Sequence, residues 1–305
     1  MDASAGELDA LLDRIPVLRG VRRTVEELDG GLTNQNLHVI TDDHDLVVRV
    51  FRGDATLLGI DRDAEHHNTR AAAEAGVGAP VVDYLPELGV LVIGFVRGVT
   101  LENSSFADPG VIQRAADACR KLHAGPRFTG DFDMFRRQAT YRRTVDENGY
   151  RLFAGYDDHA DDWRRVQTAL AQRAGPTVPC NNDLLAENFI DDGERIWLID
   201  YEYSGNNDPC FELGNIWREC RLTVDELDEL VTEYHGRALR HKLARARLQG
   251  TVSQYGWTLW GCIQNGSSAL EFDFWDWAME RYDNAVAEFN GPEFDRLLDD
   301  VNRPD

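Results

Sequence analysis

Residues 179–190, "PCNNDLLAENFI", decide how the rest of the chain is interpreted. They place Asp183 and Asn188 five positions apart, in a stretch too polar for a core and too apolar for a linker. The overlapping segment 188–203, "NFIDDGERIWLIDYEY", has apolar runs on both sides of a "DDG" turn and predicts a β-hairpin. Asp183 and Asn188 precede its first strand and Asp200 ends its second. An antiparallel pairing therefore brings these three side chains together.

Such a convergence of carboxylate and amide oxygens suits Mg²⁺, which prefers hard oxygen ligands and completes its shell with phosphates and water. Phosphoryl transfer needs these parts, because its catalysis consists mainly of positioning and charge neutralisation. In this hypothesis Asn188 and Asp200 hold the metal while Asp183 accepts a proton. Spacing alone leaves a second interpretation open, in which the three are solvated loop residues of a very acidic chain.

The pattern of the chain changes near Gly98. Before it, short β-rich runs such as "LVVRVF" (46–51) alternate with turns, and one helical stretch covers 61–76. After it, helical periodicity dominates. The sequence therefore predicts an α+β fold of two lobes, a small antiparallel sheet with one helix (1–97) and a larger, mainly helical lobe (98–305), with a ligand cleft between them. The helical stretches expected in the second lobe are 108–125, 159–175, 223–249 and 267–289.

Composition and charge exclude several classes of protein. The 305 residues, of which 43% are hydrophobic, are enough to bury a substantial core. Acidic residues number 54 against 32 basic ones, and the net charge of -22 would repel phosphate backbones and anionic membranes, so we expect no nucleic-acid partner. Lys121 and Lys242 are the only lysines, and an acidic surface poor in lysine raises the hypothesis of adaptation to high salt.

Cysteine usage and the N-terminal sequence bear on location. The five cysteines are scattered and contain no C-x-x-C pair, so neither a disulfide framework nor a zinc knuckle is indicated. The first residues, "MDASAGELDA", lack the features of a signal peptide, and no stretch approaches the roughly 18 apolar residues of a membrane span. We expect a soluble, cytoplasmic protein without membrane insertion, and the sequence does not indicate its oligomeric state.

Two motifs in order carry a resemblance to a known family. "CNNDLLAENF" (180–189) and "IWLIDYEYSGNNDPCFELGN" (196–215) resemble the catalytic loop and the metal-binding segment of the choline/ethanolamine kinase family. This family lies in the aminoglycoside-phosphotransferase-like branch of the protein-kinase-like fold, and the resemblance extends over about 28–289. The site residues that it implies are the catalytic base Asp183, the Mg²⁺ ligands Asn188 and Asp200, and Glu202, which supports the metal site.

The first lobe resembles the nucleotide-binding part of the same family. "LDGGLTNQNLHV" (28–39) offers a tight glycine turn and polar groups near the phosphates, Arg49 supplies a cation, and Glu65 on the next helix orients it. By themselves, a double glycine is usually a hairpin turn and the Arg49–Glu65 pair could be a surface ion pair. "VLVIGFVRG" (90–98) is similar to the strand and hinge that bind adenine. The residues expected at ATP are Gly30, Gly31, Thr33, Asn34, Asn36, Arg49, Glu65, Gly94, Phe95 and Val96.

Aromatic pairs in the second lobe predict the acceptor site. Trp257 and Trp260, and likewise Phe274 and Trp277, are spaced i, i+3, so each pair lies on one helix face. Aromatic stripes are usually core, and we expect some of these rings to be core. Quaternary ammonium groups are nevertheless recognised by aromatic faces. The positions resemble the family's choline pocket, in which Glu219 would be the carboxylate beside the ammonium.

Two positions depart from the family pattern. Asn181 stands where the family usually has a histidine that braces the metal-binding segment, and Glu212 stands where an aspartate typically steadies the catalytic loop. An asparagine can still bond to backbone, and one extra methylene requires only a small shift, so we expect activity to be retained. His123 matches a family helix end and is interpreted as a structural cap rather than a catalytic group.

Together these features predict an ATP- and Mg²⁺-dependent kinase that phosphorylates the hydroxyl of a small amino alcohol, with choline as the leading candidate. Four aromatic rings favour a trimethylammonium, whereas a primary ammonium asks for hydrogen-bond acceptors. Ethanolamine, thiamine and aminoglycosides remain alternative acceptors. A catalytically silent nucleotide-binding protein is the alternative of another class, which Asn181 and Glu212 suggest and the retention of Asp183, Asn188 and Asp200 opposes.

Overall fold

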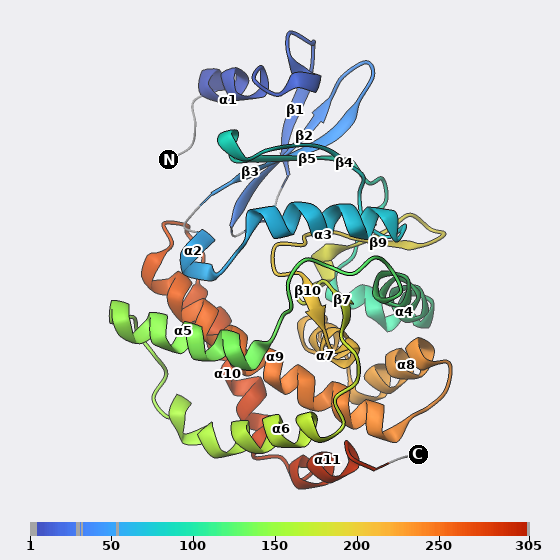
Figure 1. Ribbon diagram of the computed structural model, residues 1–305, viewed down its shortest axis with the longest axis vertical. Helices are drawn as coiled ribbons and strands as arrows, with labels where there is room; N and C mark the ends of the chain where they lie inside the picture. The colour runs from blue at the N-terminus through green and yellow to red at the C-terminus, as the bar shows by residue number, and fades with distance from the viewer. Residues whose placement is uncertain (1–4, 29–30, 32, 53–54, 304–305) are drawn as a thin grey trace.

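The computed structural model describes residues 5–28, 31, 33–52 and 55–303. Gly30 of the predicted phosphate loop lies outside the described residues. Figure 1 shows a twisted sheet at the top and a larger helical part below it, with the segment around α3 between the two. The fold is α+β, with an antiparallel sheet in the N-terminal lobe and a mainly helical remainder, as the sequence predicts.

The N-terminal sheet is antiparallel throughout, in the order β1-β2-β3-β5-β4. Its strands are β1 (Thr24–Leu28), β2 (Asn34–Ile40), β3 (Asp45–Phe51), β4 (Val81–Leu85) and β5 (Val90–Gly94). Alternate apolar residues of the central strands, including Val39, Val48 and Val92, are buried against Leu12 and Ile15 from the N-terminal segment. That segment contains α1 (Ala5–Leu12) and the 3-10 turn Pro16–Leu18. Because strand residues alternate between faces, Arg49 points away from the cluster that buries Val48.

The predicted helix at 61–76 is confirmed as α3 (Arg62–Glu74). Its N-cap is Asp61, whose carboxylate accepts a hydrogen bond from the Ala64 backbone N–H at 3.0 Å. It is preceded by the short α2 (Ala55–Leu58) and followed by a loop that leads into β4. The loop that joins β4 to β5 contains the 3-10 turn Pro86–Leu88.

Short strands shape the centre of the second lobe. The predicted hairpin is confirmed, because β8 (Phe189–Asp191) pairs antiparallel with β9 (Ile196–Leu198). Gly193 has φ 92° in the turn, a conformation that favours glycine. β6 (Val99–Thr100) adds to β8, and β10 (Gly205–Asn207) pairs with β7 (Val178–Cys180). The boundary predicted between residues 97 and 98 falls just before β6, and it stays a prediction.

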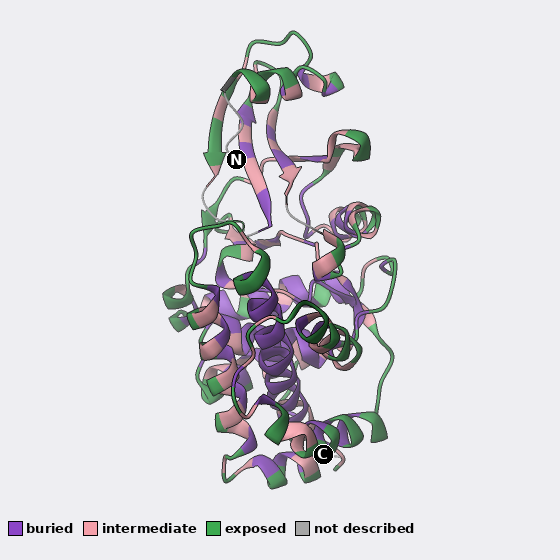
Figure 2. Ribbon diagram, turned by 90° about the vertical axis from the view of Figure 1, so that its left-hand side faces the viewer, coloured by how far each residue is buried: buried purple, intermediate pink, exposed green. Residues whose placement is uncertain are grey.

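Helices form the rest of the second lobe and pack around α9, of which residues 244–264 are all buried. In Figure 2 this helix is the buried centre of the lower part. The helices are α4 (Pro109–His123), α5 (Met134–Asn148), α6 (Ala160–Gln172), α7 (Pro209–Glu219), α8 (Val224–His235), α9 (Arg240–Ser267), α10 (Phe274–Phe289) and α11 (Phe294–Asp300). The 3-10 turns are Asn103–Ala107, Tyr156–His159 and Ala186–Asn188.

The structure divides one helical stretch that the sequence presents as continuous. Residues 223–249 contain the end of α8 at His235 and the start of α9 at Arg240. Gly236 between them has φ 70°, so the chain takes a left-handed turn that ends α8. In the stretch 267–289, α10 begins only at Phe274, where Asp273 caps it.

Two findings relate to the expected location. None of the described helices is both long and apolar enough to span a membrane. The five cysteines are buried and free, and therefore form no disulfide framework.

Candidate active site

The predicted catalytic loop runs from β7 to β8 and holds Asp183 and Asn188 side by side. The Asn188 side-chain amide donates to the Asp183 carbonyl at 2.7 Å, which leaves the Asn188 amide oxygen as a possible ligand. Asn182 has φ 70°, an uncommon conformation for a residue other than glycine, and its side chain donates to the carbonyls of Cys180 and Tyr203 at 3.2 and 3.1 Å. The sequence reasoning missed Asn182, although its place directly before Asp183 was a signal.

The metal-binding segment is tied to this loop by Asn181. Its side-chain amide donates to the carbonyls of Ile199 and Asp200, at 3.0 and 2.8 Å, and its amide oxygen accepts from the Asp183 N–H at 3.1 Å. Asp200 has φ 62°, so its backbone needs such support. Asn181 thus makes the backbone bonds that the sequence analysis expects of it.

Glu212 on α7 supports the same loop from below. Its two carboxylate oxygens accept the backbone N–H groups of Asn181 and Asn182, each at 2.7 Å. The longer glutamate therefore still reaches the loop. Asn215, one turn further on, accepts the Leu184 N–H at 2.8 Å, and the sequence analysis did not single it out.

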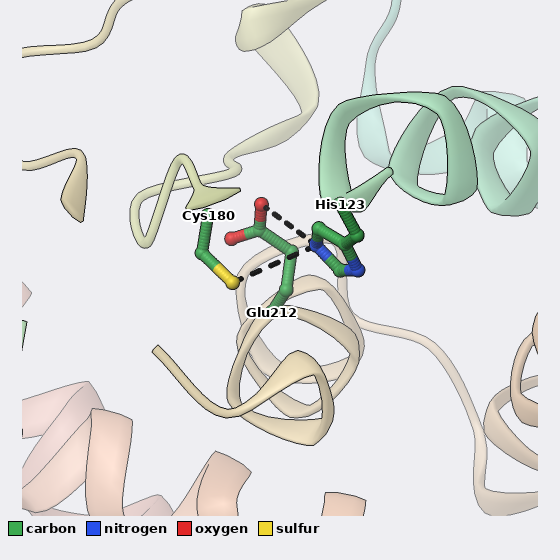
Figure 3. A group of neighbouring side chains, drawn as sticks. All are labelled: His123, Cys180 and Glu212. Atoms are coloured by element: carbon green, nitrogen blue, oxygen red, sulfur yellow. Dashed lines mark hydrogen bonds and ion pairs between the residues drawn. The ribbon is translucent and has the colours of Figure 1, made fainter. Parts of the chain in front are cut away.

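His123, Cys180 and Glu212 form a buried cluster beneath the loop (Figure 3). The His123 Nε2 atom lies 3.6 Å from the Cys180 sulfur and 3.7 Å from a Glu212 oxygen, and Nδ1 lies 2.7 Å from the Tyr234 hydroxyl. These are metal-ligand residue types. Burial raises the pKa of the Cys180 thiol well above its usual range, however, and both Glu212 oxygens already accept backbone bonds. The cluster therefore has a structural role, in which it connects α4, β7 and α7. This agrees with the interpretation of His123 as a structural rather than a catalytic residue.

Arg49 links the two lobes. One of its terminal nitrogens donates to Glu65 at 2.9 Å and to Asp200 at 2.7 Å. Burial by itself would lower the pKa of the Arg49 guanidinium. The neighbouring carboxylates of Asp200 and Glu65 outweigh this effect, so the pKa of Arg49 is raised above its usual value. The predicted Arg49–Glu65 pair is present, and its role toward a nucleotide stays a prediction.

The glycine loop meets the metal-binding segment at Glu202. The Thr33 hydroxyl donates to the two Glu202 oxygens at 2.8 and 2.9 Å, and the Asn34 amide donates to one of them at 3.0 Å. Gly31 has φ 107°, and a Cβ there would lie 2.9 Å from the Asn34 carbonyl oxygen. Only glycine therefore fits this turn without strain.

Two further side chains complete this corner. Asn36 accepts a hydrogen bond from the Arg49 Nε at 3.3 Å, so it positions the predicted cation. Arg62, which the sequence analysis missed, donates to Glu202 at 3.2 Å and to Glu65 at 2.7 Å. Nothing in the local sequence distinguished Arg62 from an ordinary residue in the first turn of a helix.

The predicted hinge residues lie at the end of β5 and directly after it. The Gly94 N–H donates to the Pro80 carbonyl at 2.8 Å and the Phe95 N–H to the Asp45 carbonyl at 2.9 Å, while the Phe95 ring stacks on His38. These two N–H groups are thus used by the protein itself. Val96 is partly exposed in the loop that follows. A narrow hollow near this hinge, about 280 Å³ including its open mouth, is lined by Arg49, Glu65, Thr69, Ala79, Leu91, Ile93 and residues 198–201.

A larger cavity, of about 1140 Å³ including its open mouth, is lined in part by the predicted catalytic loop. It brings predicted catalytic, metal and acceptor residues together from both lobes. Its lining residues are Gly31, Thr33, Asp183, Leu185, Glu187, Asn188, Asp200, Glu202, Tyr203, Trp257, Trp260, Phe272 and Trp277. It does not include Phe274 or Glu219.

The aromatic wall of this cavity consists of side chains from α9, α10 and the segment before α10. Trp260 donates its ring N–H to the Tyr203 hydroxyl at 2.7 Å, and the Trp260 and Trp277 ring centroids lie 4.9 Å apart. Phe274 is buried behind Trp260, so it belongs to the core. Phe272 lines the cavity instead. Tyr203 and Phe272 were missed, although Tyr203 lies in the quoted hairpin segment and Phe272 in the helical stretch expected at 267–289.

Glu219 lies in a neighbouring cavity of about 480 Å³ that shares Trp277 with the larger one. One of its oxygens forms a buried ion pair with Arg281 of α10, and the other accepts from Gln254 at 2.7 Å. The Arg281 guanidinium also lies over the Trp277 ring, 3.3 Å from its centroid. No sequence pattern indicated Arg281.

Two carboxyl groups at the cavity have raised pKa values. Desolvation by the surrounding protein raises the pKa of Asp183 well above its usual range, and the charges of Glu219, Asp200 and Glu202 raise it further, while Arg281 lowers it. Burial, with the Asp200 charge second, raises the pKa of Glu202 to about 7. Concentrated negative charge of this kind is typical of a functional site.

Comparison with known proteins gives the same picture. Residues 24–250 match the model of the phosphotransferase enzyme family APH. The chain is 27% identical to rat ethanolamine kinase 2, with 89% of this chain and 81% of the relative covered, and 26% identical to protein LicA of Haemophilus influenzae, with 84% and 77% covered. A crystal structure of a choline/ethanolamine kinase family protein from Mesorhizobium loti superposes with a TM-score of 0.86 at 35% identity, covering 97% of this chain and 98% of that one.

The fold, together with these similarities, defines an enzyme that transfers a phosphoryl group to an alcohol acceptor. The chain belongs to the choline/ethanolamine kinase family, within the phosphotransferase enzyme family.

Proposed function

We propose that the protein is an ATP- and Mg²⁺-dependent kinase that converts choline and ATP to phosphocholine and ADP. One observation carries the proposal: Asp183, Asn188 and Asp200 line the same cavity as three tryptophan rings. The reacting groups and an aromatic wall thus face one space. A cationic alcohol in it would place its hydroxyl near a carboxylate and its ammonium near the rings.

Asp183 acts as the general base. It orients the acceptor hydroxyl and takes its proton as the oxygen attacks the γ-phosphorus of ATP, while ADP leaves with the electron pair of the broken P–O bond. The raised pKa of Asp183 suits this task, because a base whose pKa lies closer to the working pH accepts a proton more readily in the transition state. Asn188 fixes the loop by its bond to the Asp183 carbonyl.

Residues of the catalytic loop and the metal-binding segment together fit Mg²⁺, since the Asn188 amide oxygen and the carboxylates of Asp200 and Glu202 are hard oxygen donors at one cavity. Bound Mg²⁺ would neutralise charge on the donor phosphates. Arg49 would also neutralise charge on the donor phosphates. To do so, its guanidinium exchanges the hydrogen bond to Asp200 for one to a phosphate oxygen. The turn at Gly31 lets the backbone approach the phosphates closely.

Ethanolamine is the second candidate acceptor, and the similarity to the ethanolamine kinase of rat favours it. Choline is preferred here because Trp257, Trp260 and Trp277 line the cavity, and aromatic rings bind a methylated ammonium without hydrogen bonds. Thiamine and aminoglycosides are less favoured, since the rat and Mesorhizobium loti relatives described above are named as ethanolamine or choline/ethanolamine kinases.

ADP release with Mg²⁺-ATP tests the proposal, with choline, ethanolamine, thiamine and an aminoglycoside compared at low and at molar KCl. We expect the highest kcat/KM for choline, and a kcat for Asp183→Asn that falls by about 10² to 10⁴, with little change in the KM for ATP. A higher kcat/KM for ethanolamine would move the assignment to that acceptor. Full activity of Asp183→Asn would remove Asp183 as the base.

A further inference from the structure

Five charged side chains form a continuous series of ion pairs between α3, β3 and the metal-binding segment. Asp200 pairs with Arg49 at 2.7 Å, and Arg49 pairs with Glu65 at 2.9 Å. Glu65 pairs in turn with Arg62 at 2.7 Å, and Arg62 pairs with Glu202 at 3.2 Å. Because Asp200 and Glu202 are close neighbours in the chain, both ends of the series meet in the metal-binding segment. The helix that supplies Glu65 and Arg62 lies between the two lobes (Figure 1).

Glu65 divides its carboxylate between the two arginines. One oxygen accepts from Arg49 and the other from Arg62, and the side chain is only 1% exposed. A carboxylate that is bound at both oxygens has a fixed orientation. If Arg49 exchanges Asp200 for a phosphate oxygen, as proposed, the Glu65–Arg62 bond stays in place. Arg62 therefore keeps Glu65 oriented behind Arg49 while Arg49 changes its partner.

Glu202 is held by the glycine loop and by α3 together. Thr33 and Asn34 donate to its carboxylate from the loop, and Arg62 donates to it from the helix. Of these three partners, Arg62 is the charged one, and the Glu202 side chain is only 6% exposed. Removal of a charged partner from a buried carboxylate is strongly unfavourable. Without Arg62, Glu202 would lose the contact that compensates its charge and fixes its place beside the predicted metal site.

The geometry of Arg62 explains how one residue serves both glutamates. The two bonds come from the same terminal nitrogen, and the guanidinium lies over the Phe51 ring, 4.3 Å from its centroid. Among the described residues, none accepts a hydrogen bond from the other two guanidinium nitrogens of Arg62, which are buried. Arg62 does not line the larger cavity. Its influence on that cavity therefore passes through Glu65 and Glu202.

We infer, on the basis of the proposed function, that Arg62 is a positioning residue for phosphoryl transfer, which holds Glu202 at the metal site and Glu65 behind Arg49 at the same time. One side chain thereby couples the place where the metal binds to the cation that meets the donor phosphates. Loss of Arg62 weakens both, whereas the aromatic wall, which Arg62 does not touch, keeps its arrangement.

A binding measurement tests this role without turnover. The probe is Mn²⁺, whose binding is followed by electron paramagnetic resonance at saturating ADP. Arg62→Met removes the charge and the donors but keeps an unbranched side chain beside Phe51. We expect the affinity for Mn²⁺ to fall about tenfold to hundredfold. Arg70→Met, at an exposed arginine of the same helix, is the matched control and should bind Mn²⁺ as the wild type does.

A double-mutant cycle decides whether Arg62 acts through Glu202. In the background of Glu202→Gln, the further change Arg62→Met should alter the affinity for Mn²⁺ by less than about twofold, because the residue that Arg62 positions is already lost. Equal losses in the two backgrounds would overturn the inference, and so would a wild-type affinity of the single variant Arg62→Met. Arg62→Lys should recover part of the loss, since a lysine ammonium also donates several bonds from one nitrogen.

Steady-state kinetics separate positioning from a general loosening of the fold. For Arg62→Met we expect the KM for ATP to rise about threefold to tenfold, with the KM for choline unchanged. A similar rise of both KM values would assign Arg62 a merely structural role and overturn the inference. Thermal unfolding of each variant shows that it is folded.

Failure of the proposed function has a different signature. If the wild type binds Mn²⁺ and ADP but phosphorylates no cationic alcohol, the proposed acceptor is wrong, while the binding tests of Arg62 keep their meaning. If the wild type shows no metal-dependent binding of ADP, the proposed kinase activity and the role of Arg62 are both overturned.

Discussion

Asn181 connects the predicted catalytic loop to the backbone at Asp200. It bonds to the backbone on both sides of the position where Asp200 adopts a left-handed conformation, and its own N–H is held by Glu212. If Asp200 is a metal ligand, as proposed, a residue that orients its backbone in this way affects metal affinity without touching the metal. The departure from the histidine of the family is therefore accommodated in the geometry of the loop.

Asn181→Ala removes both side-chain bonds to the 199–200 backbone, and Asp200 loses its support. We expect kcat/KM to fall roughly ten- to hundredfold and the Mg²⁺ concentration for half-maximal rate to rise. Titrating activity with Mg²⁺ measures this, with Asn148→Ala at the exposed end of α5 as a control. An unchanged Mg²⁺ requirement would show that Asp200 holds its conformation unaided.

The candidate site could be predicted from sequence to the extent that local patterns fixed it. Asp183, Asn188 and Asp200 come together because a hairpin, visible as two apolar runs around a turn, joins them. The pairs Arg62–Glu202 and Arg281–Glu219 could not be predicted, because the partners are 140 and 62 residues apart and nothing in the sequence marks a pair at that distance. The aromatic spacing identified the right helices but did not separate the lining Trp277 from the buried Phe274, since both lie on one face of α10.

At the scale of elements, the close crossing of α7 and α9 sets the base of the catalytic loop. Gly214 and Gly250 meet there, and a Cβ on Gly250 would lie 2.6 Å from the Gly214 carbonyl oxygen. The two helix backbones can approach only because neither residue has a side chain. This close approach positions α7 so that its residues Glu212 and Asn215 reach the N–H groups of the loop.

Gly250→Ala should force the two helices apart. We expect a loss of about 1–3 kcal/mol of unfolding free energy or more, together with reduced kcat, because α7 carries Glu212. Chemical denaturation measures the stability. Gly175→Ala is the control, since a Cβ there meets nothing within 4 Å. Equal stability of the two variants would mean that α7 and α9 separate without cost.

His235, the last residue of α8, makes the stability of the fold depend on pH. Burial lowers the pKa of His235 to about 4, and the positive charges of Lys242, His241 and Arg237 add to this effect. In the unfolded chain the pKa of a histidine is about 6.5. The unfolded state therefore takes up a proton that the folded state does not, and stability falls as pH drops from about 6.5 toward 4.

His235→Gln should lose less thermal stability than the wild type between pH 7 and pH 5, by a difference of a few degrees, about 2–4 °C, in Tm. Thermal unfolding followed by circular dichroism at the two pH values measures the difference. His44→Gln, in the exposed turn between β2 and β3, should behave as the wild type does. If His235→Gln also behaves as the wild type, His235 does not contribute to acid sensitivity.

Element types were predicted better than element limits. The sheet, α3, α4, α6 and the β8–β9 hairpin follow from period and turn residues. The break between α8 and α9 was not predicted, because Gly236 is a weak signal within an otherwise continuous helical pattern and glycine is tolerated inside helices. The length of α9 reflects burial on all sides, for which periodicity gives no signal.

Across the whole molecule, the dominant feature is the excess of 54 acidic over 32 basic residues. Mutual repulsion among these charges opposes the compact state, and salt reduces it by shortening the screening length from about 10 Å at 0.1 M to about 3 Å at 1 M. Surface ion pairs such as Arg127–Asp131 weaken under the same conditions, but exposed pairs of this kind contribute little.

We therefore expect Tm to rise by several degrees, about 3–8 °C, between 0.05 and 1 M KCl. Differential scanning fluorimetry measures the change. NaCl should produce the same rise if screening is the cause, whereas a rise with KCl alone would indicate binding of potassium. A Tm that stays constant or falls would show that repulsion is not a significant cost to this fold.

The Arg49–Asp200 contact has a consequence for turnover. Each of these charges is a partner of the other, so neither is left uncompensated between the lobes. If Arg49 binds a donor phosphate, as proposed, the phosphate exchanges with this pair, and the net binding free energy is the difference between the two arrangements. The same pair would re-form as ADP departs. In the proposed mechanism the contact would therefore weaken nucleotide affinity and lower the barrier to product release, which favours a high rate over tight binding when ATP is abundant.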